Sequence, residues 1–164
     1  MIHAKKTIRA GIVGSGFSAT FHFDALQRVH GTNVEVVGVY SKDSAQAAAY
    51  SRKRGIRAFD NLEALLDAVD AVHVCVPPMA HEPTAVAALK RDKFVVCEKP
   101  LTGYFGDGSA DFHWERADKA VALRSAMESV GRIVAAERAG CGRLLYAENW
   151  VYAPAVQKER EILE

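Results

Sequence analysis

The feature of this sequence that most restricts its fold is a regular alternation of short apolar runs with longer amphipathic segments. The apolar runs cover residues 8–14, 34–40, 57–59, 71–76 and 94–97. Runs of this kind are typical of strands that helices cover on both faces. Because the connections are short, successive strands are expected to be parallel and joined by right-handed crossovers. The alternation therefore predicts an α/β fold with a doubly wound parallel sheet.

The helices expected between these strands carry apolar stripes. The first is predicted over residues 18–29, and its stripe consists of Phe21, Ala25, Leu26 and Val29. After the fifth strand the rhythm changes, because residues 103–115 are polar and rich in glycine and therefore indicate a long loop. A helix over 116–138 follows, with one apolar face formed by Leu123, Met127, Val130 and Val134. Residues 144–150 then read as a sixth strand.

Composition narrows the class of protein. The chain has 164 residues, of which 49% are hydrophobic and 25% charged, so one domain with its own core is expected. A net charge of +1 gives no electrostatic footprint for nucleic acid or an anionic membrane, and no apolar stretch reaches the ~20 residues of a membrane helix. Three scattered cysteines and no signal peptide indicate a cytoplasmic protein with reduced thiols and no metal site.

The strongest local motif is the segment 14–19, which reads Gly-Ser-Gly-Phe-Ser-Ala and lies between the first strand and the first helix. Gly14 permits a tight turn, Gly16 lets the backbone approach a pyrophosphate, and the N-terminal turn that includes Phe17 and Ser18 offers unpaired N–H groups to an anion. In this position a glycine-rich turn predicts a dinucleotide site rather than a merely structural turn.

The end of the second strand bears on which dinucleotide binds. NAD-selective sites usually place a carboxylate there to bind the ribose 2′-hydroxyl. This chain instead has Ser41 and Lys42, which are suited to a 2′-phosphate, and Asp43 is expected to cap the next helix. Lys42 could also be a solvated turn residue. The sequence thus favours NADP over NAD.

Two further motifs follow the fourth and fifth strands: Pro77-Pro78 with His81, and Glu98-Lys99-Pro100. Together with the glycine turn and His22 in the first helix, they resemble the glucose-fructose oxidoreductase and inositol dehydrogenase family (Gfo/Idh/MocA), over residues 8 to about 158. The resemblance implies a Rossmann-type domain that binds NAD(P) for hydride transfer to or from a sugar, polyol or related substrate.

The resemblance also implies roles for individual residues. Lys99 would be catalytic, lying beside the nicotinamide and favouring loss of the substrate hydroxyl proton. Glu98 and Pro100 would line the cofactor pocket with Pro77, and the Lys99–Pro100 bond is often cis in the family. His81 would lie near the nicotinamide ribose, or would make only local hydrogen bonds in a helix turn. His22 is more readily interpreted as a structural residue between helix and sheet.

Members of the family carry a second α+β domain, which supplies a catalytic histidine, most substrate contacts and the oligomer interface. No segment of this chain matches that domain. We therefore expect a dinucleotide-binding domain over 1–152 and, over 153–164, the start of a helix leading toward the absent domain, through which the parent protein would form a homo-oligomer.

Two other classes of protein also use a glycine-rich first turn. A non-enzymatic NAD(P)-sensing module could share the fold, but it would have no need of a cation at Lys99. An S-adenosylmethionine methyltransferase usually has an acidic residue at the end of the second strand, and it would leave the segment 98–100 unexplained.

Overall fold

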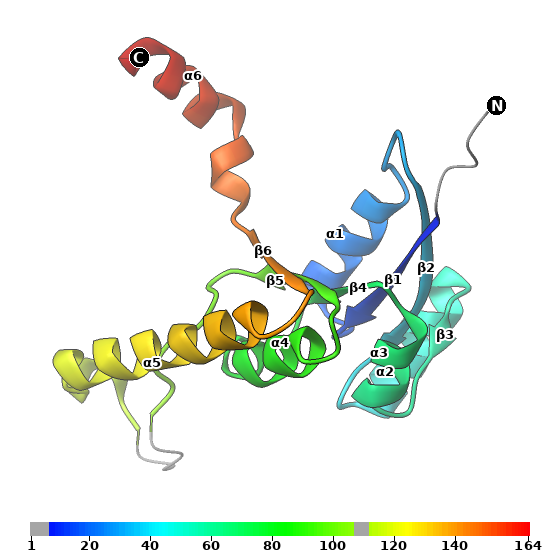
Figure 1. The fold of residues 1–164 in the computed structure, drawn as a ribbon, viewed down its shortest axis with the longest axis horizontal. Coiled ribbons are helices and arrows are strands. Elements are labelled where there is room, and N and C mark those ends of the chain that lie inside the picture. The colour runs from blue at the N-terminus through cyan, green and yellow to red at the C-terminus, as the bar shows by residue number, and fades with distance from the viewer. Residues whose placement is uncertain (1–6, 107–111) are drawn as a thin grey trace.

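The computed structural model describes residues 7–106 and 112–164, and these residues contain one six-stranded sheet (Figure 1). The order of strands is β3-β2-β1-β4-β5-β6, and every neighbouring pair is parallel. The strands are β1 (Thr7–Val13), β2 (Asn33–Tyr40), β3 (Arg57–Ala58), β4 (Ala71–Val74), β5 (Phe94–Glu98) and β6 (Arg143–Ala147). Strands β2 and β3 are added outward on one side of β1, and the chain then returns to place β4, β5 and β6 on its other side. This order confirms the predicted doubly wound Rossmann-type sheet.

Six α-helices connect or follow the strands in the described residues: α1 (Phe17–Leu26), α2 (Ser44–Arg54), α3 (Leu62–Ala68), α4 (His81–Leu89), α5 (Lys119–Arg138) and α6 (Pro154–Leu163). Three begin at a side-chain cap, because the carboxylate or amide oxygens of Asp43, Asn61 and Asp118 accept backbone N–H groups of the first turn. Short 3₁₀ turns lie at Pro78–Ala80, Trp114–Arg116 and Asn149–Tyr152.

Two buried clusters lie on opposite faces of the sheet. In the first, α3, α4 and α5 contribute side chains such as Leu65, Leu89 and Ile133 to the face formed by β1, β4 and β5. In the second, Ala19 of α1 and Tyr50 of α2 pack with side chains of β1 and β2. The Tyr50 hydroxyl donates to the carbonyl oxygen of Ala19 at 2.7 Å, and burial raises the pKa of Tyr50 to about 12. Helices thus cover both faces, which explains the continuous apolar runs of the strands.

The faces of two helices differ from the sequence prediction. On α5 the buried residues are Ala122, Ser129, Ile133 and Ala136. Leu123 and Met127, from the predicted apolar face, are 64% and 60% exposed. In the apolar stripe predicted for the first helix, Phe21 and Val29 are exposed and Leu26 is partly buried against the second cluster, and within α1 only Ala19 is fully buried. Apart from Ile133, the buried residues of the two helices are small, and larger side chains such as Met127 and Phe21 are exposed.

Several element boundaries also differ. Helix α1 ends at Leu26 rather than at residue 29, and β4 ends at Val74 rather than at residue 76. Helix α5 begins at Lys119, because Asp118 caps it there. Residues 107–111 of the predicted loop lie outside the described residues.

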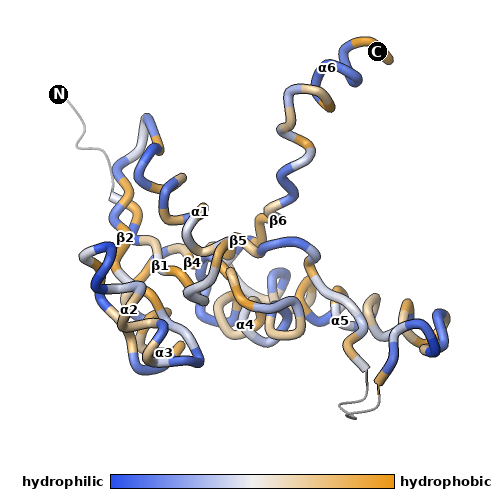
Figure 2. Tube along the Cα trace, turned by 180° about the vertical axis from the view of Figure 1, so that it is seen from behind, coloured by the Kyte–Doolittle hydropathy of each residue, from blue (hydrophilic) through white to orange (hydrophobic). Residues whose placement is uncertain are grey.

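The last elements extend away from the sheet. Strand β6 forms one edge and has no buried residue, and α6 has none either. Figure 1 shows α6 leading away from the sheet, and Figure 2 shows that α6 contains both hydrophilic and hydrophobic residues. No described helix combines the length and apolarity that crossing a membrane would require.

Candidate functional site

The glycine turn after β1 lies beside the carboxyl ends of β2 and β4. Gly14 has a φ of +105°, and its N–H donates to the carbonyl oxygen of Tyr40 at 2.7 Å. A Cβ atom at this position would lie 2.2 Å from the carbonyl oxygen of Cys75. Both the backbone conformation and the close approach to the end of β4 therefore require glycine.

The second glycine of the turn opens the N-terminus of α1 to a ligand. Gly16 is the N-cap residue, no side chain caps the helix, and a Cβ atom at Gly16 would meet nothing within 4 Å. Phe17 is exposed and Ser18 is half-buried in the turn that follows. The uncapped N–H groups and the positive end of the helix dipole suit a phosphate group, and the absence of a Cβ lets it approach the backbone.

The groups at the end of β2 are a half-buried Ser41 and an exposed Lys42. The next residue, Asp43, caps α2: its carboxylate accepts from the Gln46 N–H at 3.0 Å and from Gln46 Nε2 at 2.9 Å. The backbone hydrogen bond lowers the pKa of Asp43 below its usual value. The carboxylate is therefore engaged within its own helix, and Ser41 and Lys42 are the polar groups presented at the strand end.

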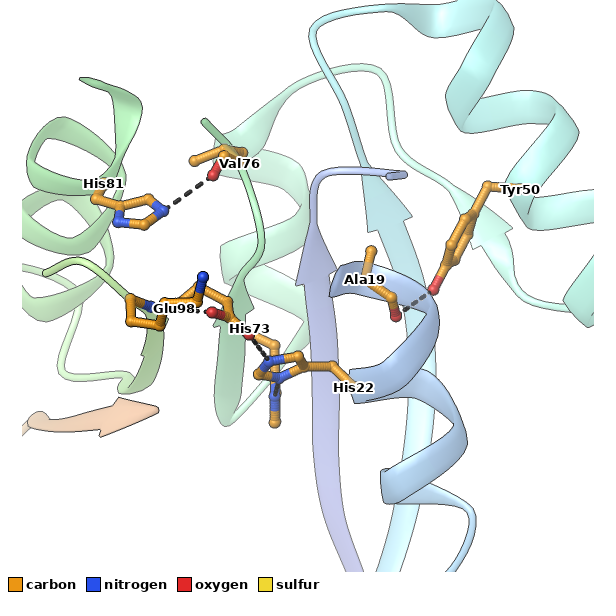
Figure 3. Close-up of polar contacts among 8 residues, drawn as sticks. Ala19, His22, Tyr50, His73, Val76, His81 and Glu98 are labelled. Atoms are coloured by element: carbon orange, nitrogen blue, oxygen red, sulfur yellow. Dashed lines mark hydrogen bonds and ion pairs between the residues drawn. The ribbon is translucent and has the colours of Figure 1, made fainter. Parts of the chain in front are cut away.

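His81 joins the loops that follow β4 and β5. Its ring is buried, with 1% of the residue exposed. Nε2 lies 2.9 Å from the carbonyl oxygen of Val76 (Figure 3). Nδ1 lies 2.8 Å from the carbonyl oxygen of Pro100. Both contacts are to backbone, so His81 fixes the two loops that flank Pro77 and Lys99. The prediction that it contacts the cofactor ribose stays a prediction.

The segment 98–100 brings a carboxylate and a cation to the end of β5. Glu98 uses both oxygens within the domain: Oε1 lies 3.0 Å from Nε2 of His22, and Oε2 accepts the Lys99 N–H at 2.9 Å. The Lys99–Pro100 peptide bond is cis, as expected. Lys99 is exposed, and among residues 7–106 and 112–164 no hydrogen bond or ion pair occupies its Nζ. The ammonium group is thus available to a ligand.

A second histidine completes a polar chain behind Glu98. Nδ1 of His22 lies 2.7 Å from Nδ1 of His73, which stands on β4 (Figure 3). Burial, with a contribution from His22, lowers the pKa of His73 to about 4. His73 is therefore neutral at neutral pH. Sequence reasoning missed this residue, because a single histidine in an apolar strand gives no sign of a partner 51 positions away.

A groove of about 840 Å³ runs between α1 and the ends of β4, β5 and β6. It brings together Phe17, Ser18, Glu98 and Lys99 of the predicted site, and the polar chain His22–His73 also lines it. The apolar stripe of α1 and the residues after β6, including Asn149 and Tyr152, form its walls. The other predicted site residues lie outside the groove: Gly14, Gly16, Ser41, Lys42, Pro77, His81 and Pro100.

The described part of the chain contains no cluster of three or more residues suited to holding a metal ion. Its cysteines are free, and Cys75 and Cys97 are buried. Burial raises the pKa of each of these two thiols to about 12, so neither is a reactive thiolate.

A parallel sheet whose first strand leads through a glycine turn to an uncapped helix N-terminus defines the class of dinucleotide-binding domains. The chain belongs to the GFO_IDH_MocA oxidoreductase family with an NAD-binding Rossmann fold, whose model matches residues 8–126. This confirms the resemblance that the segment 98–100 and the glycine turn indicated.

Relatives with known activities support this assignment. The chain is 39% identical over 101 residues to an inositol 2-dehydrogenase of Corynebacterium glutamicum, covering 59% of this chain and 29% of that protein. It is 36% identical over 93 residues to a glucose-6-phosphate 3-dehydrogenase of Bacillus subtilis, covering 57% of this chain and 26% of that protein. The chain thus matches less than a third of the length of either relative.

Solved structures extend the likeness to the whole described fold. The myo-inositol dehydrogenase of Lactobacillus casei, solved with NAD(H) and myo-inositol, superimposes with a TM-score of 0.74 at 26% identity, covering 96% of this chain and 41% of that one. An oxidoreductase of Thermotoga maritima gives a TM-score of 0.76 at 26% identity, covering 96% and 43%. Since these relatives are oxidoreductases, neither the sensing module nor the methyltransferase is favoured.

Proposed function

We propose that this chain binds NADP in preference to NAD and serves hydride transfer to or from a sugar, a polyol or a related hydroxyl or carbonyl compound. The observation that carries the proposal is the combination of an open, uncapped helix N-terminus at Gly16 with an exposed cation at Lys99 that has no partner in the described part of the chain. When bound, the nicotinamide supplies the hydride acceptor or donor. The chain's own residues hold the phosphates and place a positive charge beside the reacting oxygen.

The phosphates would be held by the N–H groups after Gly16, with Gly14 keeping the turn close to β4. The preference for NADP is supported by the end of β2, where Asp43 is engaged as a helix cap and Lys42 is exposed. Pro77, His81 and Pro100 would shape the pocket through the two loops that His81 joins. Glu98 would line the cofactor pocket next to Lys99.

Lys99 would act on the substrate. Oxidation of an alcohol transfers a hydride to the nicotinamide and releases the hydroxyl proton, and a cation next to that oxygen favours the release. The relatives that act on inositol and on glucose 6-phosphate support a hydroxyl-bearing substrate. By the same family relationship we propose a second domain over the part of the protein beyond this chain, homo-oligomer formation through it, and a cytoplasmic location.

Titration of the chain with NAD, NADH, NADP and NADPH, read by cofactor fluorescence or by thermal shift, tests cofactor binding. Gly16→Val should abolish binding, because its side chain would occupy the path of the phosphates without a clash inside the protein. Gly131→Val on α5 is a matched control, since a Cβ there also meets nothing within 4 Å. Equal affinity of the Gly16→Val variant and the parent would refute the phosphate site.

Selectivity has its own test. Lys42→Ala should weaken NADP binding by about tenfold and leave NAD binding unchanged, because only NADP carries the 2′-phosphate. Lys90→Ala, at an exposed position after α4, is the control. Tighter binding of NAD than NADP by the parent chain would refute the preference.

The role of Lys99 requires a protein that includes the second domain. There Lys99→Ala should lower kcat for the polyol or sugar by a factor of at least about 10², which is typical for removal of a group that stabilises developing charge. Cofactor affinity should change little. Full activity of that variant would refute the role, and the 164-residue chain alone should show no turnover.

A further inference from the structure

Two histidines and a carboxylate connect β4, α1 and the end of β5 through consecutive hydrogen bonds (Figure 3). Nδ1 of His73 lies 2.7 Å from Nδ1 of His22, and Nε2 of His22 lies 3.0 Å from Oε1 of Glu98. The other oxygen of Glu98 accepts the backbone N–H of Lys99 at 2.9 Å. The side chains of His22 and Glu98 are only 13% and 20% exposed. This chain of contacts, His73–His22–Glu98–Lys99, ends on the residue whose ammonium group has no partner among residues 7–106 and 112–164.

The chemistry of these groups determines the donor and the acceptor in each hydrogen bond of this chain of contacts. A carboxylate can only accept hydrogen bonds, so Nε2 of His22 carries a proton and donates to Glu98. When both rings are neutral, Nδ1 of His22 is then an acceptor, and Nδ1 of His73 must carry the proton between them. Burial lowers the pKa of His73 to about 4, which keeps this ring neutral. All donors therefore point toward Glu98.

We propose that His73 and His22 are positioning residues for Lys99: they orient Glu98, which in turn fixes the backbone on which Lys99 stands. The inference rests on the proposed function in taking Lys99 as the cation that acts on substrate. Because Nζ of Lys99 has no partner in the described residues, its placement depends on its backbone. The side chains that form these links, those of His73, His22 and Glu98, make no described hydrogen bond to the glycine turn or to the end of β2.

The tautomers can be observed directly. ¹⁵N NMR of the chain at a pH about two units above the ordinary histidine pKa should show His22 protonated at Nε2 and His73 at Nδ1. In Glu98→Gln an amide replaces the carboxylate, which can only accept hydrogen bonds. The NH₂ group of this amide must then face one of the two groups that donate to Glu98, either Nε2 of His22 or the N–H of Lys99. Either the tautomers of His22 and His73 both reverse, or the Lys99 amide loses protection from hydrogen exchange. If neither changes, the chain of contacts does not operate and the inference is overturned.

Conservative variants separate positioning from packing. His73→Asn retains a donor in place of Nδ1, whereas His73→Val retains a strand-forming side chain without a donor. Exchange protection of the Lys99 amide should be near that of the parent in His73→Asn and lower by about tenfold in His73→Val, which corresponds to ~1.4 kcal/mol. His30→Val, at an exposed position outside the chain of contacts, is the control. Equal protection in all variants would refute the role of His73.

In the protein with its second domain, His73→Val should lower kcat about tenfold or more, since small misplacements of a positioned group are costly. The dissociation constant for NADPH should stay within about twofold of the parent. A change confined to cofactor affinity would overturn the inference. The two proposals fail separately: absence of NADP and NAD binding would refute the proposed function, while the tautomers and the Lys99 amide report on the hydrogen bonds alone.

Discussion

Strands β1 and β6 belong to the same parallel sheet, but they stand in different surroundings. The last four residues of β1 are all buried, whereas β6 has no buried residue. The helices that accompany them differ in the same way: α3 buries Leu65 and Leu66, and α6 buries nothing. The region around β1 is therefore stabilised by its own core and can hold a turn as constrained as that at Gly14, while the region after β6 is supported mainly by local bonds.

The groove lies at the boundary between these two regions. Its inner side carries the polar chain, in which His73 on β4 and Glu98 on β5 are held in register by neighbouring strands and His22 is supplied by α1. Its outer walls carry apolar side chains that remain open to solvent, such as Phe21 at 60% and Tyr152 at 81% exposure. Residues on the inner side are held in place by the core, whereas residues on the outer walls have few buried contacts. Substitutions near the core should therefore lower stability more than substitutions on the outer walls.

The largest effect is expected at the turn beside β1. Gly14→Val would force a β-branched side chain into a positive φ and against the carbonyl oxygen of Cys75. The free energy of unfolding in urea should fall by about 3 kcal/mol or more, or the chain should fail to fold. Gly16→Val serves as the control and should unfold near the parent midpoint, since its Cβ has open space. Similar midpoints for Gly14→Val and the parent would contradict the described turn.

A smaller but still large difference is expected between two leucines. Leu66→Ala removes a fully buried side chain on α3 and should cost about 2–5 kcal/mol of unfolding free energy. Leu145→Ala on β6 removes a side chain that is 49% exposed and should cost less than about 1 kcal/mol. Urea denaturation of both variants measures the contrast. Equal losses would show that β6 is packed as tightly as the core around β1.

The stability of the folded state should depend on pH through His73, a member of the polar chain. The pKa of His73 is about 4 in the folded protein against 6.5 for an ordinary histidine, so the unfolded chain binds the proton more readily. The folded state should therefore be fully stable above pH 6.5 and should lose stability as the pH falls toward 4. The loss at the acidic end is on the order of 2–3 kcal/mol.

Urea unfolding at a series of pH values, carried out on the parent and on His73→Val, measures this contribution. In the variant the decline of stability between these pH values should become shallower. His30→Val is the control, because His30 is exposed, and it should retain the decline of the parent. A parent and a His73→Val variant with parallel profiles would show that His73 does not titrate as described.

The same contrast explains what could be predicted from the sequence. The strands around β1, the glycine turn and the segment 98–100 were predictable, because apolar runs and glycine spacing are local signals. The packing faces of α1 and α5 were not, because periodicity gives most weight to large residues such as Met127, whereas apart from Ile133 the buried residues of these helices are small ones such as Ala122 and Ser129. The contact between His22 and His73 depends on the pairing of β1 with β4, which no local pattern specifies.

The smallest effect is expected at α6. This helix has ten residues and no buried side chain, and its ion pairs Lys158–Glu161 and Arg160–Glu164 are exposed and contribute little. A helix of that length is marginal in water without packing. Ile162→Gly should therefore speed hydrogen exchange of the α6 amides, since glycine disfavours a helix by about 1 kcal/mol, and leave the unfolding midpoint of the domain unchanged. Ile133→Gly on the buried face of α5 is the contrasting variant and should lower the midpoint strongly. If Ile162→Gly also lowered the midpoint, α6 would be part of the cooperative core, and the contrast between the two ends of the sheet would not hold.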